Sequence, residues 1–312
     1  MDALNIGIDV SKDRLDVAAN ASSLAPFHVP RDHAGLAELV ERLRPLSVER
    51  VAVEATGGFE AIVAAALAGA GLPVVVVNPA QVRAFAQALG KRAKTDPIDA
   101  AVIARFAEAT RPEVRPLPDA ETEALADLVT RRRQIVAMIG AESQRLQRAS
   151  KRTAKSINRL LKALEKELAD INGDIDDSIR RSSNWLEKAE LLKSVPGVGD
   201  QIARTLIAEL PELGTLDRRQ IAALVGLAPW TRQSGQWRGK SFIGGGRAGV
   251  RTALYMGALS AAKHNASLKA FRNRLVESGK PKMLAIIAVA RKLITILNAI
   301  IRDNQPWREV PA

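Results

Sequence analysis

The order of strand and helix signals in the first hundred residues limits the possible folds more than any other feature of this sequence. Strand signals lie at residues 4–9, 14–18, 26–30, 50–55 and 72–77, and helix signals at residues 32–43, at residues 58–70 and after Asn78-Pro79. Three strands come first, and helices and strands alternate afterwards. This order is ribonuclease H-like, whereas a doubly wound dinucleotide-binding fold alternates from its start. The sequence thus predicts an α/β ribonuclease H-like domain, and its β-branched run at 72–77 predicts a strand buried on both faces.

Four carboxylates stand out in this predicted domain. Asp9 and Glu54 each end a strand, and acids at the carboxyl ends of neighbouring strands converge on one edge of a sheet. Asp96 and Asp99 open a helix three residues apart, so they share a helix face. Clustered carboxylates repel one another unless a hard cation lies between them, so the set favours a site for Mg²⁺ or Mn²⁺.

Each acid also has an ordinary structural interpretation. Asp9 stands where a turn residue is common, and Glu54 is compatible with a solvated strand end. Asp96 is a suitable N-cap, with Pro97 in the first turn and Asp99 near the positive end of the helix. Taken together on one fold, the four acids favour the metal site over these separate explanations.

A basic helical arm is predicted after a proline-rich boundary at residues 112–118. The heptad seam of this arm consists of Ile157, Leu161, Leu164, Leu168 and Ile171, which predicts a helical hairpin or coiled coil. Ten basic residues stand against one acid, Glu142, between residues 131 and 162. They are Arg131, Arg132, Arg133, Arg145, Arg148, Lys151, Arg152, Lys155, Arg159 and Lys162. This imbalance favours nucleic-acid binding over a solvated, salt-bridged helix, with the first eight as the candidate contacts.

The last third of the sequence is predicted to be mostly helical, after a turn at residues 172–183. Val195-Pro196-Gly197-Val198-Gly199 resembles a helix-hairpin-helix element, although such sequences also form ordinary turns. No Asp or Glu occurs from Arg218 to Val276, where eleven Lys or Arg do. The candidate nucleic-acid contacts here are Arg232, Arg238, Lys240, Arg247 and Arg251. Trp230 and Trp237 lie among them and suit either base stacking or a core.

Composition excludes several kinds of site. The chain has no cysteine and three histidines, which rules out thiolate chemistry and leaves little for a His-based zinc site or a Ser-His-Asp triad. The 46 Lys and Arg exceed the 34 Asp and Glu, for a net charge of +12, which points to a polyanion such as nucleic acid. An N-terminus without a signal-peptide pattern predicts a cytoplasmic, nucleoid-associated protein with no membrane partner.

Short segments in a fixed order carry a resemblance to one family. They are Ile6-Gly7-Ile8-Asp9-Val10-Ser11-Lys12, Glu54-Ala55-Thr56-Gly57, Val77-Asn78-Pro79, Lys94-Thr95-Asp96-x-x-Asp99-Ala100, Pro196-Gly197-Val198-Gly199, Gly226-Leu227-Ala228-Pro229, Ser234-Gly235 and Leu254-Tyr255-Met256. In this order the chain resembles the DEDD insertion-sequence transposases, a family that includes the Piv-like DNA invertases and the bridge-RNA-guided recombinases.

The resemblance implies a mechanism. The four acids of a RuvC-like domain would be Asp9, Glu54, Asp96 and Asp99, which bind divalent metal, and the nucleophile would be Ser234. It also implies a structured bridge RNA, DNA of the element ends and target as partners, and dimers that come together in pairs. One departure concerns the Lys and paired Arg that follow the serine in relatives: this chain retains one Arg of the pair and lacks the Lys, and Arg247 is its nearest substitute.

Three other functions compete with this interpretation. A RuvC-type junction resolvase would use the acids and metal-activated water without a covalent intermediate. A sugar-kinase or actin-like ATPase also begins with a Gly-Ile-Asp strand, but it needs a glycine after the aspartate, and Val10-Ser11-Lys12-Asp13 has none. A non-catalytic RNA- or DNA-binding protein is disfavoured because all four acids are present.

Three domains are expected from these patterns. They are a RuvC-like metal-binding domain at residues 1–112, a basic coiled-coil arm at residues 119–183, and a mostly α-helical transposase domain with the serine nucleophile at residues 184–312.

Overall fold

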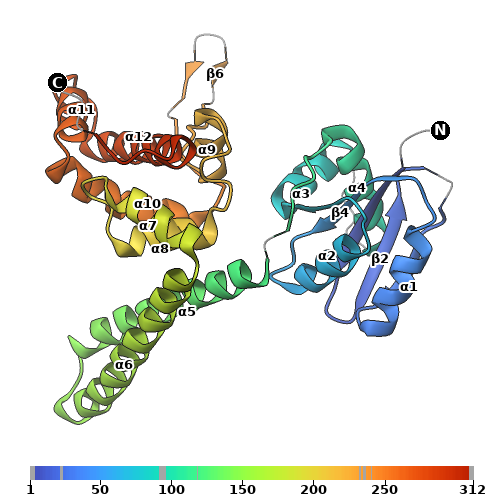
Figure 1. Ribbon diagram of the computed structural model, residues 1–312, viewed down its shortest axis with the longest axis horizontal. Helices are drawn as coiled ribbons and strands as arrows, with labels where there is room; N and C mark the ends of the chain where they lie inside the picture. The colour runs from blue at the N-terminus through green and yellow to red at the C-terminus, as the bar shows by residue number, and fades with distance from the viewer. Residues whose placement is uncertain are drawn as a thin grey trace. The chain divides into compact units, whose positions relative to one another are not determined.

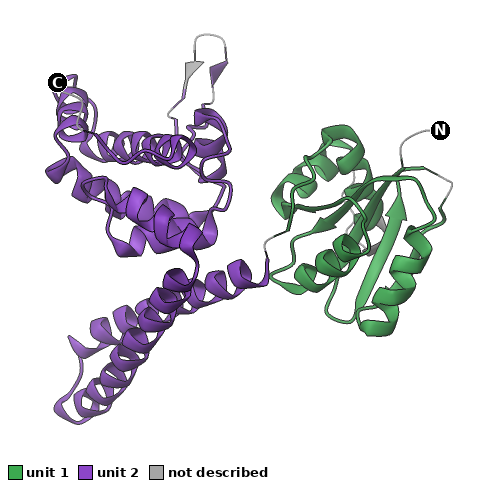
Figure 2. Cartoon of the chain, viewed as in Figure 1, with its two compact units in different colours: residues 1–117 green, residues 118–312 purple. Residues whose placement is uncertain are grey.

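The computed structural model describes residues 4–21, 24–90, 96–117, 119–231, 233–234, 237–239 and 241–308, with only the backbone at 96–98 and 237–238. The chain forms two compact units, residues 1–117 and residues 118–312 (Figure 2). The first unit contains a β-sheet together with helices, and the second unit is mostly helical. This confirms the coarse α/β-then-helical architecture expected from the sequence.

Unit 1 is built on a five-stranded sheet with the order β3-β2-β1-β4-β5. Its elements are β1 (Leu4–Val10), β2 (Arg14–Ala19), β3 (Phe27–Pro30), α1 (His33–Leu43), β4 (Val48–Glu54), α2 (Phe59–Gly69), β5 (Val74–Val77), α3 (Pro79–Ala88) and α4 (Asp96–Thr110). The first three strands pair antiparallel, whereas β4 and β5 continue the sheet in parallel with β1. Three leading strands followed by alternation were predicted, and the structure has this order.

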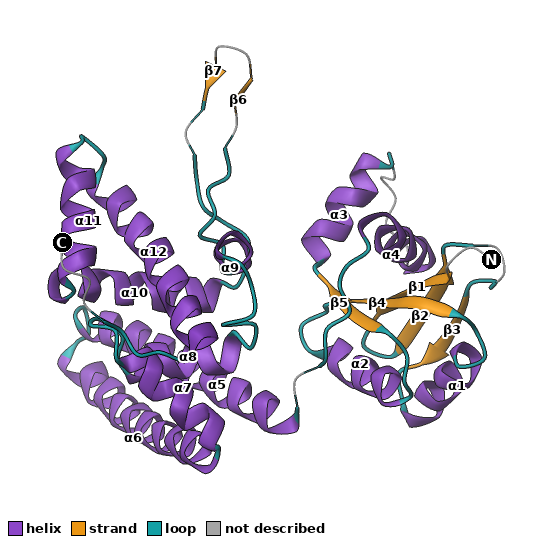
Figure 3. Cartoon of the chain, turned by 45° about the horizontal axis from the view of Figure 1, so that its top comes forward, coloured by secondary structure: helices purple, strands orange, loops and turns teal. Residues whose placement is uncertain are grey.

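Helices cover both faces of this sheet (Figure 3). Ile6 and Ile8 of β1 point to one face, where they pack with Leu39 of α1 and Leu67 of α2 in one hydrophobic cluster. The other face carries α3 and α4, whose Val82, Ile103 and Phe106 pack against Ala52 and Val77 of the strands. Side chains alternate between the two faces along a strand. In β1, the even-numbered Ile6 and Ile8 therefore lie on the first face, and the odd-numbered residues beside them lie on the face that α3 and α4 cover.

Gly7 brings α4 directly onto the sheet. A Cβ atom at this position would overlap the carbonyl oxygen of Ala100 and the amide nitrogen of Ala104, and it would lie 2.9 Å from the carbonyl carbon of Ile103. No side chain larger than hydrogen fits there, so the backbone of α4 crosses β1 at contact distance. This close crossing sets where the first turn of α4 lies.

The prediction that the strand at 72–77 is buried on both faces is wrong. β5 is an edge strand, and Val76 is 42% exposed although Val74 and Val77 are buried. The uninterrupted β-branched run reflects strand propensity, which does not depend on having a helix over every residue.

Unit 2 contains the remaining elements. They are α5 (Ala120–Leu146), α6 (Lys151–Arg181), α7 (Ser183–Lys193), α8 (Asp200–Glu209), α9 (Arg218–Leu224), β6 (Gln233–Ser234), β7 (Trp237–Arg238), α10 (Ala248–His264), α11 (Ala266–Glu277) and α12 (Lys282–Asp303). Helix α12 is long and apolar enough to cross a membrane by length and composition alone. Its Val289, Leu293 and Leu297 are fully buried in the core that it shares with the other helices of this unit.

Helices α5 and α6 form a hairpin that extends from the rest of unit 2 (Figure 1). The predicted seam lies on its inner side, since Leu161 and Ile171 are buried and Leu164 and Leu168 pack against the core. The structure thus contains a helical hairpin, while the supercoil of a true coiled coil stays a prediction.

The turn predicted at residues 172–183 is wrong, because α6 continues to Arg181. Ile175 and Ile179 extend the apolar seam by two further turns and are 0% and 6% exposed. Their burial stabilises the helix through the polar stretch around Gly173, at a site where a glycine costs only about 1 kcal/mol. The chain breaks one residue later at Ser182, whose hydroxyl caps α7.

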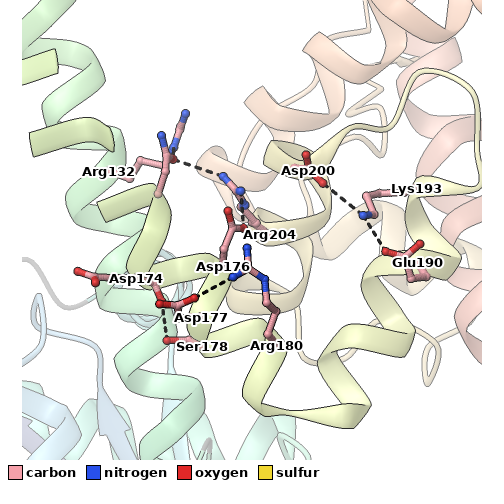
Figure 4. Close-up of polar contacts among 11 residues, drawn as sticks. Arg132, Asp174, Asp176, Asp177, Ser178, Arg180, Glu190, Lys193, Asp200 and Arg204 are labelled. Atoms are coloured by element: carbon pink, nitrogen blue, oxygen red, sulfur yellow. Dashed lines mark hydrogen bonds and ion pairs between the residues drawn. The ribbon is translucent and has the colours of Figure 1, made fainter. Parts of the chain in front are cut away.

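Polar contacts join the two helices of the arm to α8 (Figure 4). The Asn172 Oδ1 atom of α6 accepts hydrogen bonds from Arg132 Nε of α5 at 2.7 Å and from Arg204 Nη1 of α8 at 3.4 Å. Arg204 also forms an ion pair with Asp176. Burial, with a smaller effect from the nearby Arg204 cation, lowers the pKa of Arg132. Three helices therefore meet at one amide, which ties the base of the arm to α8.

Candidate functional site

Asp9 and Glu54 lie next to each other on one face of the sheet. β1 and β4 are parallel neighbours with Gly7 opposite Ala52 and Ile8 opposite Val53. The residues that follow are Asp9, the last but one of β1, and Glu54, the last of β4. Both have the parity of Gly7 and Ala52, which places them on the face that α4 covers. Both side chains are half-buried. The convergence of these two acids, expected from strand order, is therefore consistent with the observed register.

Helix α4 brings a third predicted acid to this face. The helix begins at Asp96, and Asp99 is half-buried one residue before Ala100, the residue whose carbonyl lies over Gly7. Gly7 and Asp9 are two residues apart on the same side of β1, so the first turn of α4 lies in their neighbourhood. The side chain of Asp96 lies outside the described residues.

A further acid, Asp16, lies on the same face and was not among the predicted site residues. It is paired with Asp9 across β1 and β2, is 5% exposed, and accepts a hydrogen bond from Arg14 Nε at 2.8 Å. Adjacent strands are about 4.8 Å apart, so Asp16, Asp9 and Glu54 form a row across three strands. The sequence signal for Asp16 was the alternation of Arg14, Asp16 and Ala18 along the strand. This alternation does not reveal which residue of the neighbouring strand lies opposite Asp16.

The donor chemistry of this face suits a hard divalent cation. Carboxylate oxygens are the ligands that Mg²⁺ prefers, and adjacent strands supply two of them at one sheet edge. Among the residues whose side chains are described, no three acids or histidines converge closely enough to hold an ion by themselves. Asp9, Glu54 and Asp99 thus offer the ligand type that such an ion prefers, and a complete ligand set would require Asp96, substrate oxygens or water.

Ser234 lies on a β-hairpin of unit 2, whereas the four predicted acids belong to unit 1. It belongs to β6, is exposed, and pairs with Trp237 of β7. No acid lies between residues 218 and 276, so this stretch supplies no carboxylate base. Arg232 and Lys240 lie outside the described residues, and for Arg238 only the backbone in β7 is described.

The base of this hairpin is held tightly between α9 and α10. Arg247 binds Glu212 in a bidentate pair, with Nη2 2.6 Å from Oε1, and donates to the Glu209 carbonyl at 2.9 Å. Arg251 donates to the carbonyl of Gly245. Gly246 has φ of 59°, and a Cβ added there would overlap backbone atoms of Leu224 and Gly226. The guanidinium groups of Arg247 and Arg251 therefore bond to other residues of unit 2 at the base of the hairpin.

Replacing Arg247 by Met is expected to lower the free energy of unfolding by about 1–2 kcal/mol, because Glu212 is left without its bidentate partner. The arginine side chain is 34% exposed, so water screens part of the loss and the effect stays below that of a fully buried pair. Urea unfolding of unit 2 measures it. Arg131→Met, which removes an exposed cation bonded to the exposed Gln134, is the matched control; equal losses in both variants would contradict the prediction.

The predicted basic contacts of the arm fall into two groups. Arg132 and Arg133 are bonded within unit 2, to Asn172 and to Glu209 respectively. The others are exposed: Arg131 lies beside those two near the base of the arm, whereas the rest lie toward the tip of the hairpin, with Arg145 paired to Glu142 of the same helix. These exposed residues are Arg131, Arg145, Arg148, Lys151, Arg152 and Lys155.

The Pro-Gly turn forms part of a real helix–turn–helix between α7 and α8, but its glycine has a packing role. Gly197 has φ of 104°, and a Cβ there would lie 2.5 Å from the amide nitrogen of Ala261 on α10. Gly197 thus allows close packing on α10, whereas Gly199 at the N-terminus of α8 is exposed, so contact with a phosphate at this turn stays a prediction.

Comparison with known proteins identifies the family of the chain. A family model of DEDD transposases of the IS110 type, described as "Transposase", matches residues 6–165, and a second, "Transposase IS116/IS110/IS902 family", matches residues 189–273. Pilin gene-inverting proteins of Moraxella bovis and Moraxella lacunata are each 29% identical over 97% of this chain and 97% of their own length. An uncharacterized protein of the insertion element IS116 from Streptomyces clavuligerus is 26% identical over 63% of this chain and 47% of its own. The chain therefore belongs to the IS110 family of DEDD transposases and is a DNA-recombining enzyme.

Proposed function

We propose that this transposase cuts and rejoins DNA through a covalent link between Ser234 and a DNA phosphate. The placement of Asp9 and Glu54 at the ends of adjacent strands, under the helix that carries Asp99, is the observation that supports a metal-assisted reaction most directly. Ser234 is exposed on a hairpin that is anchored at its base, as a nucleophile that must reach a bulky substrate requires.

The chemistry is an exchange of phosphate esters. The Oγ atom of Ser234 forms a bond to phosphorus, the bond from phosphorus to one bridging oxygen of the DNA breaks, and the serine proton leaves as the departing oxygen gains one. The hydroxyl of the strand to be joined then attacks the phosphoserine and releases Ser234. The number of ester bonds is conserved, so no ATP is needed.

Asp9, Glu54, Asp96 and Asp99 would hold Mg²⁺ or Mn²⁺. The ion supplies positive charge that stabilises the transition state at the phosphate. A serine hydroxyl is a weak nucleophile at its ordinary pKa and needs a base or a cation nearby. The acid-free stretch around Ser234 cannot supply that base, and we assign the role to the metal held by the acids of unit 1, from the same chain or from another copy.

The proposal extends to the partners. Residues 1–112 would act as the RuvC-like metal domain, residues 119–183 as a coiled-coil arm, and residues 184–312 as the domain of the serine. The exposed basic residues near the arm tip suit a bridge RNA or the element DNA, and Arg232, Arg238 and Lys240 would act near the cleaved strand. Arg247 and Arg251, which bond to Glu212 and to the Gly245 carbonyl, would hold the base of the hairpin. The family resemblance supports assembly as a dimer or tetramer, and the site of action would be the cytoplasm, on the nucleoid.

Covalent trapping tests the proposed function. Protein with any co-purifying RNA retained is incubated with labelled element-end and target DNA and Mg²⁺, denatured, and resolved for a protein–DNA band. Ser234→Ala should remove the band completely, whereas Ser241→Ala, which alters an exposed serine next to the same hairpin, should retain it. Omission of Mg²⁺ should also remove it.

A clean cut without a band, unchanged in Ser234→Ala, would reject the serine nucleophile. That result would favour a RuvC-type nuclease that uses the same acids and water. A band that persists after nuclease removal of the RNA would reject the bridge-RNA requirement and leave the serine chemistry intact. A mixture of Asp9→Ala and Ser234→Ala chains that regains the band would indicate that acids and serine come from different copies.

A further inference from the structure

Two large aromatic side chains lie exposed at the stem of the hairpin that carries Ser234. Trp230 is 59% exposed and Phe242 is 47% exposed. The two residues face each other across an antiparallel bridge, with Trp230 N donating to Phe242 O at 2.8 Å and Phe242 N to Trp230 O at 3.2 Å. Their rings are stacked, with centroids 6.4 Å apart and an angle of 11° between the planes. The stem therefore carries two exposed aromatic rings whose planes are nearly parallel.

These rings do not serve the hydrophobic core. The main cluster of unit 2 includes the neighbouring Ile243 and Leu224 but neither Trp230 nor Phe242. Trp230 is held in place by Nε1, which donates to the Gly244 carbonyl at 3.3 Å, and the adjoining turn is anchored by Arg247 and Arg251. Exposed aromatic faces on an anchored support cost little further conformational entropy when a ligand binds them.

We propose that Trp230 and Phe242 form a stacking platform for an unpaired base of the DNA strand that Ser234 attacks. The proposal rests on the proposed function of Ser234. Trp230 and Ser234 are four residues apart, so at most about 14 Å of extended chain separates them. The nucleotides beside the attacked phosphate thus lie within reach of the rings.

The surroundings of the platform select nucleic acid over an apolar partner. No acid occurs from residue 218 to residue 276, where eleven cations do, so a phosphate backbone meets no repulsion along this stretch. Strand exchange requires bases near the cut to separate from their partners, and an aromatic face stacks on any base without reading its sequence. Stacking on the platform would stabilise the open strand while the phosphate is attacked.

Binding to strands with and without bases tests the platform. The full chain, in EDTA so that nothing is cut, is titrated with labelled oligothymidylate and with an abasic strand of equal length, and the ratio of the two affinities is measured. Trp230→Leu should lower this ratio roughly 5- to 150-fold, the effect expected for one stacked base. Trp230→Phe should retain most of the ratio. Phe59→Leu, which removes a 43% exposed ring from unit 1, should not change it.

Several results would overturn the platform. If Trp230→Leu weakens both strands equally, the ring only supports the hairpin. If Trp230→Leu lowers the ratio for oligouridylate but not for oligothymidylate, the site binds RNA. If the substitution changes only the mass of the protein assembly in solution, the site binds a second copy of the chain. Cleavage plays no part in this assay, so failure of covalent trapping leaves the measured ratio intact.

A second experiment tests the link between the platform and Ser234. In covalent trapping, Trp230→Leu should reduce the adduct with fully paired DNA and regain it when the base beside the cut is left unpaired. An equal reduction on both substrates would contradict a role in holding that base.

Discussion

Replacing Asp9 by Asn is expected to reduce DNA cleavage about 1,000-fold or more while the chain remains folded. Asp9 lies at the end of the central strand β1, with Glu54 on one neighbouring strand and Asp16 on the other. An amide retains the shape of the side chain but removes the charge that a divalent cation requires. Loss of the charge stabilisation that such an ion supplies at a phosphate, several kcal/mol, corresponds to this rate reduction. Cleavage of labelled element-end DNA under single-turnover conditions measures it.

Metal binding separates this expectation from simple misfolding. A ligand that binds only the folded state raises the unfolding temperature, so Mg²⁺ or Mn²⁺ should stabilise the unaltered chain and should fail to stabilise Asp9→Asn. Asp13→Asn alters an exposed acid in the turn after β1 and should behave as the unaltered chain in both assays. Normal cleavage by Asp9→Asn would reject the assignment of this acid to the metal site.

Much of unit 1 was predictable because its signals are local. Strands and helices were read from short runs, and the element order then placed Asp9 and Glu54 at strand ends without knowledge of the register. What the sequence does not contain is pairing across strands, so the position of Asp16 opposite Asp9 became visible only in the sheet. The exposure of Val76 was missed for the same reason, since burial depends on which neighbouring elements cover a strand.

Unit 2 shows where local signals mislead. Gly173 and the acids around it suggested a turn, yet Ile175 and Ile179 decide the outcome, because burying them against α5 and the following helices stabilises α6 beyond the polar stretch. Likewise, the sequence suggests Arg247 as a substitute cation for phosphate, but its bond to Glu212, thirty-five residues earlier, cannot be inferred from its position. A basic residue identifies a possible contact, but only its neighbours in space show whether its charge is already engaged.

Gly7→Ala is expected to lower the free energy of unfolding by about 3 kcal/mol, the upper part of the range for overpacking a core. The added methyl group would overlap backbone atoms of Ala100 and Ala104, and backbone cannot rotate aside as a side chain can. Helix α4 must therefore move away from β1, which opens the packing of Ala52 and Ile103. Urea unfolding followed by circular dichroism measures the change.

The same displacement should affect the site. Asp99 precedes Ala100 directly, so a shift of α4 moves this acid away from Asp9 and Glu54 and should weaken Mg²⁺ stabilisation even at temperatures where Gly7→Ala is folded. Gly140→Ala is the matched control, because nothing lies within 4 Å of the added atom on α5 and alanine should stabilise that helix by about 0.5–1 kcal/mol. If Gly7→Ala lost stability but bound Mg²⁺ as before, Asp99 would not belong to the metal site, and the remaining acids of the sheet would have to hold the ion without α4.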